Sequence, residues 1–172
     1  MAVSPAVAPD LDELLGELSR TLWKQRGLIE HLQYRLEVQQ MVLASSREAR
    51  LQIALEEVEA AMEDIRRSER SRDVIVRQCA NHLTLVESAS LADIRDRVGD
   101  PWATVLGEHQ DALLALVAET ERLATMNREL ALRGANDSRS VLDAVTGTAP
   151  ATAYGPSGSR GLSRPALVDR QA

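Results

Sequence analysis

Phenylalanine is absent from this 172-residue chain, and aromatic residues make up only 2% of it, as two tryptophans and two tyrosines. A compact β-sandwich or an α/β enzyme normally uses bulky rings in its core and at its site, so this scarcity argues against both classes. The hydrophobic fraction is nevertheless 44%. The apolar side chains are therefore mostly leucine, valine, isoleucine and alanine, which is typical of long helices that meet along narrow seams.

Other absences narrow the class of protein further. The single cysteine, Cys79, excludes an intramolecular disulfide. A net charge of −6 argues against a general binder of nucleic acid or of acidic membranes. No stretch approaches the ~18 uninterrupted apolar residues of a transmembrane helix, and the opening MAVSPAVAPD lacks the basic and apolar regions of a signal peptide. We therefore expect a cytoplasmic protein that does not insert into a membrane.

Motifs that carry chemistry are missing as well. None of His31, His82 and His109 has a second metal ligand four residues away, and the sequence contains no phosphate-binding loop, dinucleotide fingerprint or nucleophile elbow. The most basic run, RRSERSR (66–72), is interrupted and flanked by acidic residues, which favours ion pairs within a helix over contacts to nucleic acid. The sequence thus predicts no enzyme activity, no metal site and no cofactor.

What is present is a heptad pattern. Four helices are expected over about 11–43, 46–84, 91–98 and 101–145, between a disordered N-terminus (1–9) and a flexible tail (147–172) that is rich in glycine and proline. Asp10, with Glu13 three residues on, is expected to cap the first helix. The seam of that helix consists of Leu11, Leu15, Leu18, Leu22, Ile29, Leu32, Leu36 and Leu43, with Gln25 and Gln39 at the two remaining positions.

The second helix is expected to fold back on the first. Ser45 and Glu48 have the spacing of a capping box, so the chain is predicted to turn there and to form an antiparallel hairpin. Its seam is expected to run through Leu51, Leu55, Val58, Met62, Ile65, Glu69, Arg72, Val76, Cys79 and Leu83. The alternative is a structural or scaffold coiled coil that acts by homo-oligomerisation, with a continuous helix and no break at 44–46.

The third long helix follows a short connecting helix, which Ser90 is expected to cap and Gly99 to close. Its seam consists of Leu106, His109, Leu113, Leu116, Thr120, Leu123, Asn127 and Leu130. Beyond Leu130, Gly134 and the run NDS (136–138) predict fraying or a kink before Val141. The predicted fold is thus all-α: an elongated antiparallel helical bundle or coiled-coil hairpin with a third long helix and a flexible C-terminal tail.

Two sets of residues leave alternatives open. Gln25, Gln39 and Asn127 lie at seam positions, where a polar residue either fixes the register of packed helices or turns towards solvent. Trp23 and Trp102 lie near leucines, which favours core anchoring over the stacking of a ligand. Tyr154, in TAYGPSGSR (152–160), has no apolar neighbours to pack against. It is either a docking anchor beside the turn that Gly155, Pro156 and Gly158 favour, or an incidental tyrosine in an inert tail.

Four segments carry a family resemblance. They are LLGELSRTLWKQRGLIEHLQYRLEVQQ (14–40), LEEVEAAMEDIRRSE (55–69), PWATVLGEHQDALLALVAETERLATMNREL (101–130) and TAYGPSG (152–158). In their order along the chain they resemble the FlgN-like flagellar export chaperones. The resemblance implies a cytoplasmic chaperone that binds the C-terminal helical region of the hook–filament junction proteins FlgK and FlgL, prevents their premature assembly and delivers them to the export gate protein FlhA.

The resemblance also implies where the partners bind. In the family the C-terminal third contacts the client and a tyrosine near the C-terminus contacts the gate, which here is Tyr154. The hypothesised gate-docking residues are Tyr154, Gly155, Pro156 and Gly158. The hypothesised client-binding residues, on a helix expected to outlast its partners, are Leu123, Leu130, Val141, Leu142 and Val145. The heptads also allow a homodimer.

Overall fold

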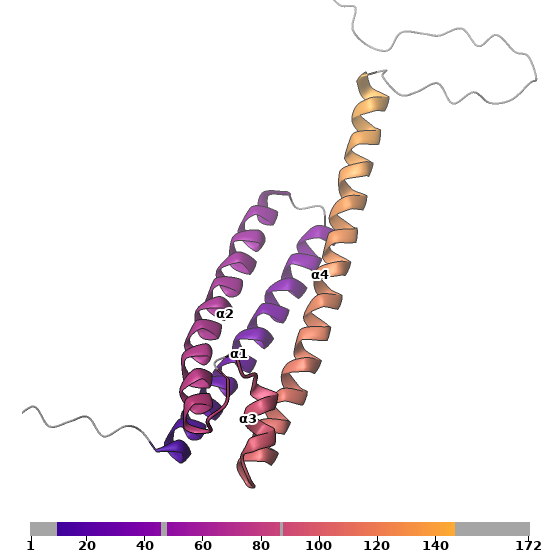
Figure 1. Cartoon of the computed structure of the whole chain (residues 1–172). Helices are drawn as coiled ribbons and strands as arrows, with labels where there is room; N and C mark the ends of the chain where they lie inside the picture. The colour runs from indigo at the N-terminus through magenta and orange to yellow at the C-terminus, as the bar shows by residue number, and fades with distance from the viewer. Residues whose placement is uncertain (1–9, 46–47, 87, 147–172) are drawn as a thin grey trace, which may run out of the picture. The chain divides into compact units, whose positions relative to one another are not determined.

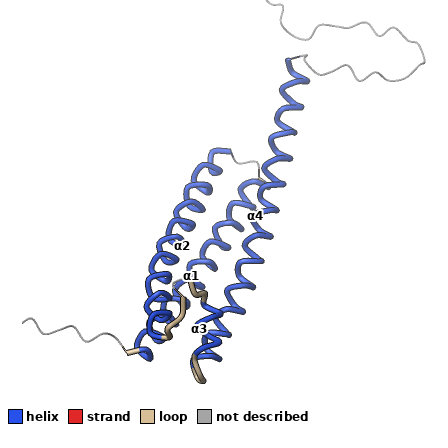
Figure 2. The backbone as a smooth tube through the Cα atoms, viewed as in Figure 1, coloured by secondary structure: helices blue, strands red, loops and turns tan. Residues whose placement is uncertain are grey.

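The computed structural model describes residues 10–45, 48–86 and 88–146. These residues form four helices, which are α1 (Leu11–Ala44), α2 (Glu48–His82), α3 (Leu91–Arg97) and α4 (Trp102–Thr146) (Figure 1). Within the described ranges no segment forms a strand (Figure 2). The prediction of an all-α fold with three long helices and one short helix is confirmed.

Helix α1 is capped at both of its ends. Asp10 caps α1 as expected, since its carboxylate accepts a hydrogen bond from the Leu11 backbone N–H at 2.8 Å. Ser45 closes α1: its backbone N–H donates to the carbonyl oxygens of Met41 and Val42, and its hydroxyl donates to the Val42 carbonyl at 3.0 Å. The predicted capping box of Ser45 with Glu48 spans residues 46 and 47, which lie outside the described residues.

The contacts of α1 with α2 establish an antiparallel hairpin. Near the start of α1, four leucines from Leu14 to Leu22 pack with Ile75 and Cys79 of the end of α2. Near the other end of α1, Leu32 and Leu36 pack with Val58 and Ala61. This pairing opposes the continuous coil that the scaffold alternative requires, because the apolar heptad positions of α1 are buried within its own chain.

The seam of α2 differs in part from the prediction: Val58 and Cys79 are buried as expected, whereas most of its other buried residues lie one position before the expected ones. Several of its buried residues are small; they are Ala54, Val58, Ala61, Ser68, Ile75, Cys79 and Ala80. Leu55, which was expected on the seam, is 41% exposed. Small side chains reduce the distance at which two helices pack, so the leucines of α1 fill the interface against alanine and serine of α2. The larger apolar residues of α2 flank this line of contact.

Helix α4 runs in the same direction as α1, antiparallel to α2 (Figure 1). The Trp102 indole N–H donates to Asp12 at 2.6 Å, and the Asn127 amide donates to Gln39 at 2.8 Å. The first turn of α4 therefore lies beside the first turn of α1, and a later part of α4 lies beside the last turns of α1. The short helix α3 connects α2 to α4. It begins at a capping box formed by Ser90 and Asp93, and its C-cap is Val98, one residue before the expected Gly99.

The two tryptophans behave differently from one another. Trp102 is half-buried and packs against the cluster of α1 leucines, which confirms its role as a core anchor. Trp23 is 60% exposed, so the same prediction was wrong for this residue. Its ring is instead covered on one face by the guanidinium of Arg26, whose central carbon lies 4.2 Å from the ring centroid.

Buried amides fix the register of the three long helices. Gln25, Gln39 and Asn127 are only 3%, 8% and 5% exposed, so the alternative in which they turn towards solvent was wrong. Gln25 accepts from Arg72 of α2 at 3.3 Å, whereas Asn127 of α4 donates to both Gln39 and the Leu36 carbonyl of α1. A shift of one turn would leave these groups buried without partners, so each amide pins α1 to one neighbour.

The basic run 66–72 forms the expected ion pairs along the surface of α2. Arg66 and Arg70 both reach Glu63, and Arg67 reaches Asp64. These arginines are therefore neutralised by carboxylates of their own helix.

The chain divides by its internal contacts into two units, residues 1–137 and 138–172. In the first unit α4 contributes the buried seam residues Leu106, His109, Leu123 and Asn127. In the second unit the described residues, 138–146, are helical. Helix α4 continues without a break through Gly134 to Thr146. A single glycine costs a helix only about 1 kcal/mol relative to alanine.

Candidate functional site

The last turns of α4 carry an uncovered apolar surface. Val141, Leu142 and Val145 are 63%, 63% and 76% exposed. Their spacing of i, i+1 and i+4 places them on one side of the helix. Large apolar side chains that cluster in the open are typical of a surface that another protein covers. These three residues are the part of the hypothesised client site that the structure leaves accessible.

Two other hypothesised client-binding residues lie in the first unit. Leu123 is only 3% exposed, because it is enclosed by Leu32 and Leu36 of α1 and by Val58 and Ala61 of α2. It therefore belongs to the core and is not accessible as a contact for a client. Leu130 is half-buried at the end of the same seam. The hypothesised gate-docking residues Tyr154, Gly155, Pro156 and Gly158 lie outside the described residues.

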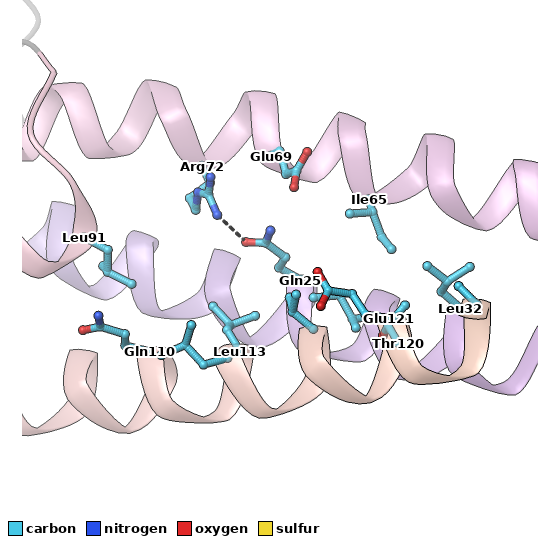
Figure 3. Close-up of a pocket in the computed structure, with 14 residues that line it drawn as sticks. Gln25, Leu32, Ile65, Glu69, Arg72, Leu91, Gln110, Leu113, Thr120 and Glu121 are labelled. Carbon is cyan, nitrogen blue, oxygen red and sulfur yellow. Dashed lines mark hydrogen bonds between the residues drawn. The ribbon is translucent and has the colours of Figure 1, made fainter. Parts of the chain in front are cut away.

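A second apolar surface lies between α2 and α4 (Figure 3). It is a cavity of about 450 Å³, which we call the α2–α4 groove. Its floor is formed by α1, one wall by α2 and the other wall by α4, and Leu91, the first residue of α3, lies at one end. Leu114 and Val117 of the α4 wall are 63% and 44% exposed. The groove is thus an open apolar surface within the first unit.

Each long helix contributes to the groove at helical spacing. The lining residues are Gln25, Ile29 and Leu32 of α1, Ile65, Glu69 and Arg72 of α2, and Gln110, Leu113, Leu114, Val117, Thr120, Glu121 and Ala124 of α4. Spacings of three and four residues on all three helices are those of a helix that faces a partner. The position between α2 and α4 therefore has the geometry of an unfilled site for a fourth helix.

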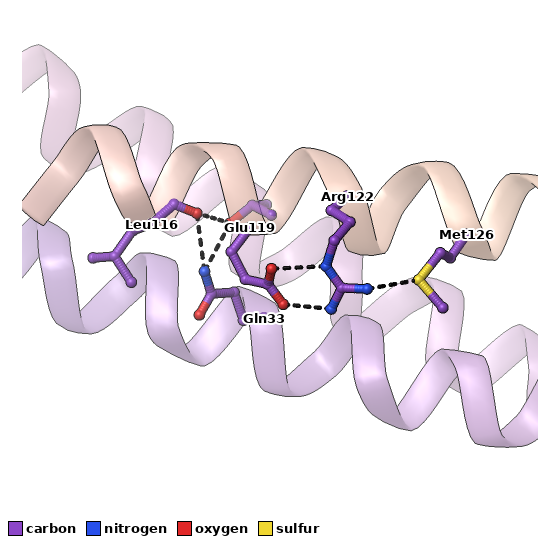
Figure 4. Close-up of polar contacts among 6 residues, drawn as sticks. Gln33, Leu116, Glu119, Arg122 and Met126 are labelled. Atoms are coloured by element: carbon purple, nitrogen blue, oxygen red, sulfur yellow. Dashed lines mark hydrogen bonds and ion pairs between the residues drawn. The ribbon is translucent and has the colours of Figure 1, made fainter.

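Most polar groups around the groove are already bonded. Arg72 donates to Gln25 at 3.3 Å, as Figure 3 shows, and Gln110 accepts from Arg95 at 2.6 Å. Thr120 donates to the Leu116 carbonyl, and Gln33 of α1 donates to both of them (Figure 4). Glu69 of α2 and Glu121 of α4 are different: neither forms an ion pair or hydrogen bond with any residue that the structure describes.

On the solvent side of α4, charged side chains pair with one another within the helix. Glu119 and Arg122 form two hydrogen bonds of 2.8 and 2.6 Å, and Arg122 also reaches the sulfur of Met126 (Figure 4). The guanidinium of Arg122 lowers the pKa of the Glu119 carboxyl. This side of α4 is thus satisfied internally, in contrast to the side that lines the groove.

Sequence reasoning did not identify the groove. The seam assigned to α4 contained Leu113 and Leu116, whereas Leu114 and Val117 lie beside it and were not considered. A signal was present in the segment LLALV (113–117), because two adjacent apolar stripes on one helix indicate two packing partners. One partner of α4 is α1, and the described residues leave the second place open.

His109 joins α4 to α1 through a small polar cluster. Its side chain is 2% exposed, its Nε2 lies 3.0 Å from the Ser19 hydroxyl, and its ring meets Trp23 edge-on with centroids 5.2 Å apart. Burial, together with the nearby charge of Arg26, lowers the pKa of His109, while Glu108 opposes the shift. The imidazole is therefore neutral at pH 7, and its Nδ1 is buried without a partner in the described part of the chain.

This environment predicts a loss of stability in mild acid. The pKa of His109 in the folded chain is lower than its value of about 6.5 in the unfolded chain, so the unfolded state takes up a proton first as the pH falls. The stability that the neutral, buried imidazole contributes to the folded chain is complete above pH ~6.5 and is lost progressively below it. Urea titrations at pH 7.5 and 5.5 should show a smaller loss for His109→Gln than for the unsubstituted protein, and equal losses would contradict the assignment.

Groups suited to other chemistry are not assembled in the described residues. Cys79 is fully buried, and burial raises its pKa to about 11, so its thiol stays protonated at neutral pH. Among residues 10–45, 48–86 and 88–146, no three histidine, cysteine, aspartate or glutamate side chains lie together as a metal site would require. Of the helices described, none has the length and hydrophobicity needed to cross a bilayer.

Comparison with protein families gave a match over most of the chain. The family model described as FlgN protein matches residues 14–161 of this chain, which includes all four helices except the first three residues of α1. Searches of curated proteins and of solved structures returned no match.

Proposed function

The chain belongs to the FlgN family of flagellar export chaperones, which bind hook-associated client proteins, and from this premise we propose how it works. We propose that it is a cytoplasmic chaperone for the hook–filament junction proteins FlgK and FlgL. It binds the C-terminal helical region of a client, prevents premature assembly and delivers the client to the export gate protein FlhA.

The observation that carries this proposal is the exposed apolar surface at the end of α4. Val141, Leu142 and Val145 present three branched apolar side chains to solvent on one side of a helix. An amphipathic helix of a client can cover such a surface with its own apolar stripe. Leu130, half-buried on the same helix, is a further proposed contact. Leu123 is buried and is therefore not part of the proposed site.

Binding of this kind suits a chaperone that must later release its client. A contact of roughly 800 Å² per partner is sufficient for a specific complex, and affinity at that size depends on a few anchor residues. Release then requires only that another protein compete for the chaperone or for the client. In the proposed sequence of events, the competing protein is found at the export gate.

Direct binding tests the proposal. Purified FlgK and FlgL, titrated separately into the full chain, should each form a complex, and versions that lack the C-terminal helical region should not. Co-purification from the native cell should recover the same proteins. If neither protein binds and neither is recovered, the proposed clients are wrong, whatever the family of the chaperone.

Tyr154 is proposed as the anchor for the export gate, together with the adjacent Gly155, Pro156 and Gly158. The ring combines apolar area with a hydroxyl, and the neighbouring proline and glycines favour a turn that reduces the entropy lost on docking. Losing an anchor of this type typically costs about 2 kcal/mol, which is more than tenfold in affinity.

Tyr154→Ala should therefore weaken binding to FlhA by more than tenfold and reduce secretion of FlgK and FlgL. Tyr154→Phe should have a smaller effect, and binding of the client to the purified chaperone should be the same in all three proteins. If Tyr154→Ala secretes clients at the normal rate, the tyrosine is incidental and the gate contacts the chaperone elsewhere.

A further inference from the structure

The α2–α4 groove is distinct from the apolar surface at the end of α4, so the proposed client does not explain what binds in it. All its lining residues lie between positions 25 and 124, within the first unit of the chain. Its α4 wall extends from Gln110 to Ala124, which corresponds to roughly 21 Å at 1.5 Å per residue. That length accommodates about four turns of a helix. We propose that the groove binds an amphipathic helix of a protein partner whose apolar stripe is flanked on both sides by lysine or arginine.

The apolar lining decides in favour of a helix. Ile29 and Leu32 form the floor, Ile65 lies on the α2 wall, and Leu113 and Val117 lie on the α4 wall. Because these residues are supplied at spacings of three and four, a helix with apolar residues at the same spacing can interdigitate with all three helices. A small ligand would instead need several converging polar groups to orient it, whereas the lining of the groove is mainly apolar.

The charges decide which helix fits. Glu69 projects from the α2 wall and Glu121 from the α4 wall, so one carboxylate stands on each side of the apolar floor (Figure 3). Neither is paired within the described residues, whereas the only cation that lines the groove, Arg72, is bonded to Gln25 and paired with Asp73. A helix with basic residues on both flanks would pair with Glu69 and Glu121, and one with acidic residues there would be repelled.

Two model peptides of 18 residues test this proposal on the full chain. Both carry leucine at positions spaced i, i+3, i+4 and i+7, and they differ only in having lysine or glutamate on both flanks of the stripe. In titrations followed by fluorescence anisotropy, the lysine peptide should bind at least tenfold more tightly than the glutamate peptide. Equal affinities, or no binding of either peptide, would overturn the proposal.

Charge reversal locates the binding site. In the double variant Glu69→Lys/Glu121→Lys the preference should invert, so that the glutamate peptide binds more tightly. The matched control is Glu30→Lys/Glu59→Lys, which reverses two exposed carboxylates outside the groove and should keep the original preference. If both double variants change the preference equally, net charge explains the binding and the groove does not.

A substitution on the α4 wall separates the groove from the other surface. Leu114→Asp should weaken binding of the lysine peptide at least tenfold, whereas Ala115→Asp, on the neighbouring exposed position, should not. If sedimentation instead shows a dimer that Leu114→Asp dissociates, a second copy of the chain fills the groove and the proposal is wrong. The test does not depend on FlgK or FlgL, so its failure is distinguishable from failure of the proposed function.

Discussion

Replacing Val141 and Leu142 together by aspartate is expected to abolish capture of the client's C-terminal helix, with a dissociation constant at least ~100-fold larger. The two side chains are each 63% exposed, so the substitution removes apolar area that is available to a partner and not area that is buried in the bundle. In the complex, two carboxylates would be desolvated without a counter-charge, which adds to the loss of the apolar contact. The melting temperature should change little, because substitutions at exposed positions usually alter stability by less than ~0.5 kcal/mol.

A control variant separates loss of apolar contact from added charge. Ala115→Asp/Ala118→Asp introduces the same two charges at exposed positions of α4 that do not line the groove. It should bind the client as the unsubstituted protein does when both are measured by isothermal titration calorimetry. If Val141→Asp/Leu142→Asp binds normally, the client contacts another surface. If it fails to fold, these residues belong to a core and the proposed site is wrong.

Replacing Ala61 by glutamate is expected to destabilise the chain by about 3 kcal/mol or more. Ala61 is 3% exposed and lies in the α1–α2 interface beside Leu32 and Leu36. A glutamate there must either bury a carboxylate without a partner or force the two helices apart. In a chain of this size the corresponding fall in melting temperature is roughly 6–12 °C.

The neighbouring alanine provides the matched control. Ala60 is exposed on α2, so Ala60→Glu makes the same chemical change one position away and should shift the melting temperature by less than ~2 °C. Thermal unfolding followed by circular dichroism measures both variants. If the two variants melt together, Ala61 is not enclosed by α1, and the seam of α2 has to be sought along Leu55 and Met62.

Local patterns in the sequence were enough to predict the four helices and all the buried residues of α1 and α4 except Leu14. In α1, leucines spaced alternately by three and four can only be buried together if they form one face of a helix. The capping residues Asp10 and Ser90 were also identified correctly, because the hydrogen bonds of a cap involve only neighbouring residues. The family resemblance rested on the order of the same segments, and the match over residues 14–161 confirms it.

Only the tertiary structure shows which face of each helix is buried against its neighbours. On α2, Ala54 and Ala61 are buried and Leu55 is exposed, although leucine is the more hydrophobic residue and would be expected in the core. The choice depends on how closely α1 approaches, and that distance is set by side chains on both helices. Whether Gln25 and Asn127 face solvent or a neighbour likewise depends on partners that lie far along the chain.

The α2–α4 groove is decided at the same level, because it exists only between helices. No single helix contains it: Glu69 and Glu121 are 52 positions apart in the numbering, and Ile29 of the floor lies on a third helix. A pattern within one helix shows that a face needs a partner, but it does not show whether the fold supplies one. For α1 the fold supplies α2 and α4, whereas the described residues leave the space between the facing sides of α2 and α4 open, apart from Leu91 of α3 at one end.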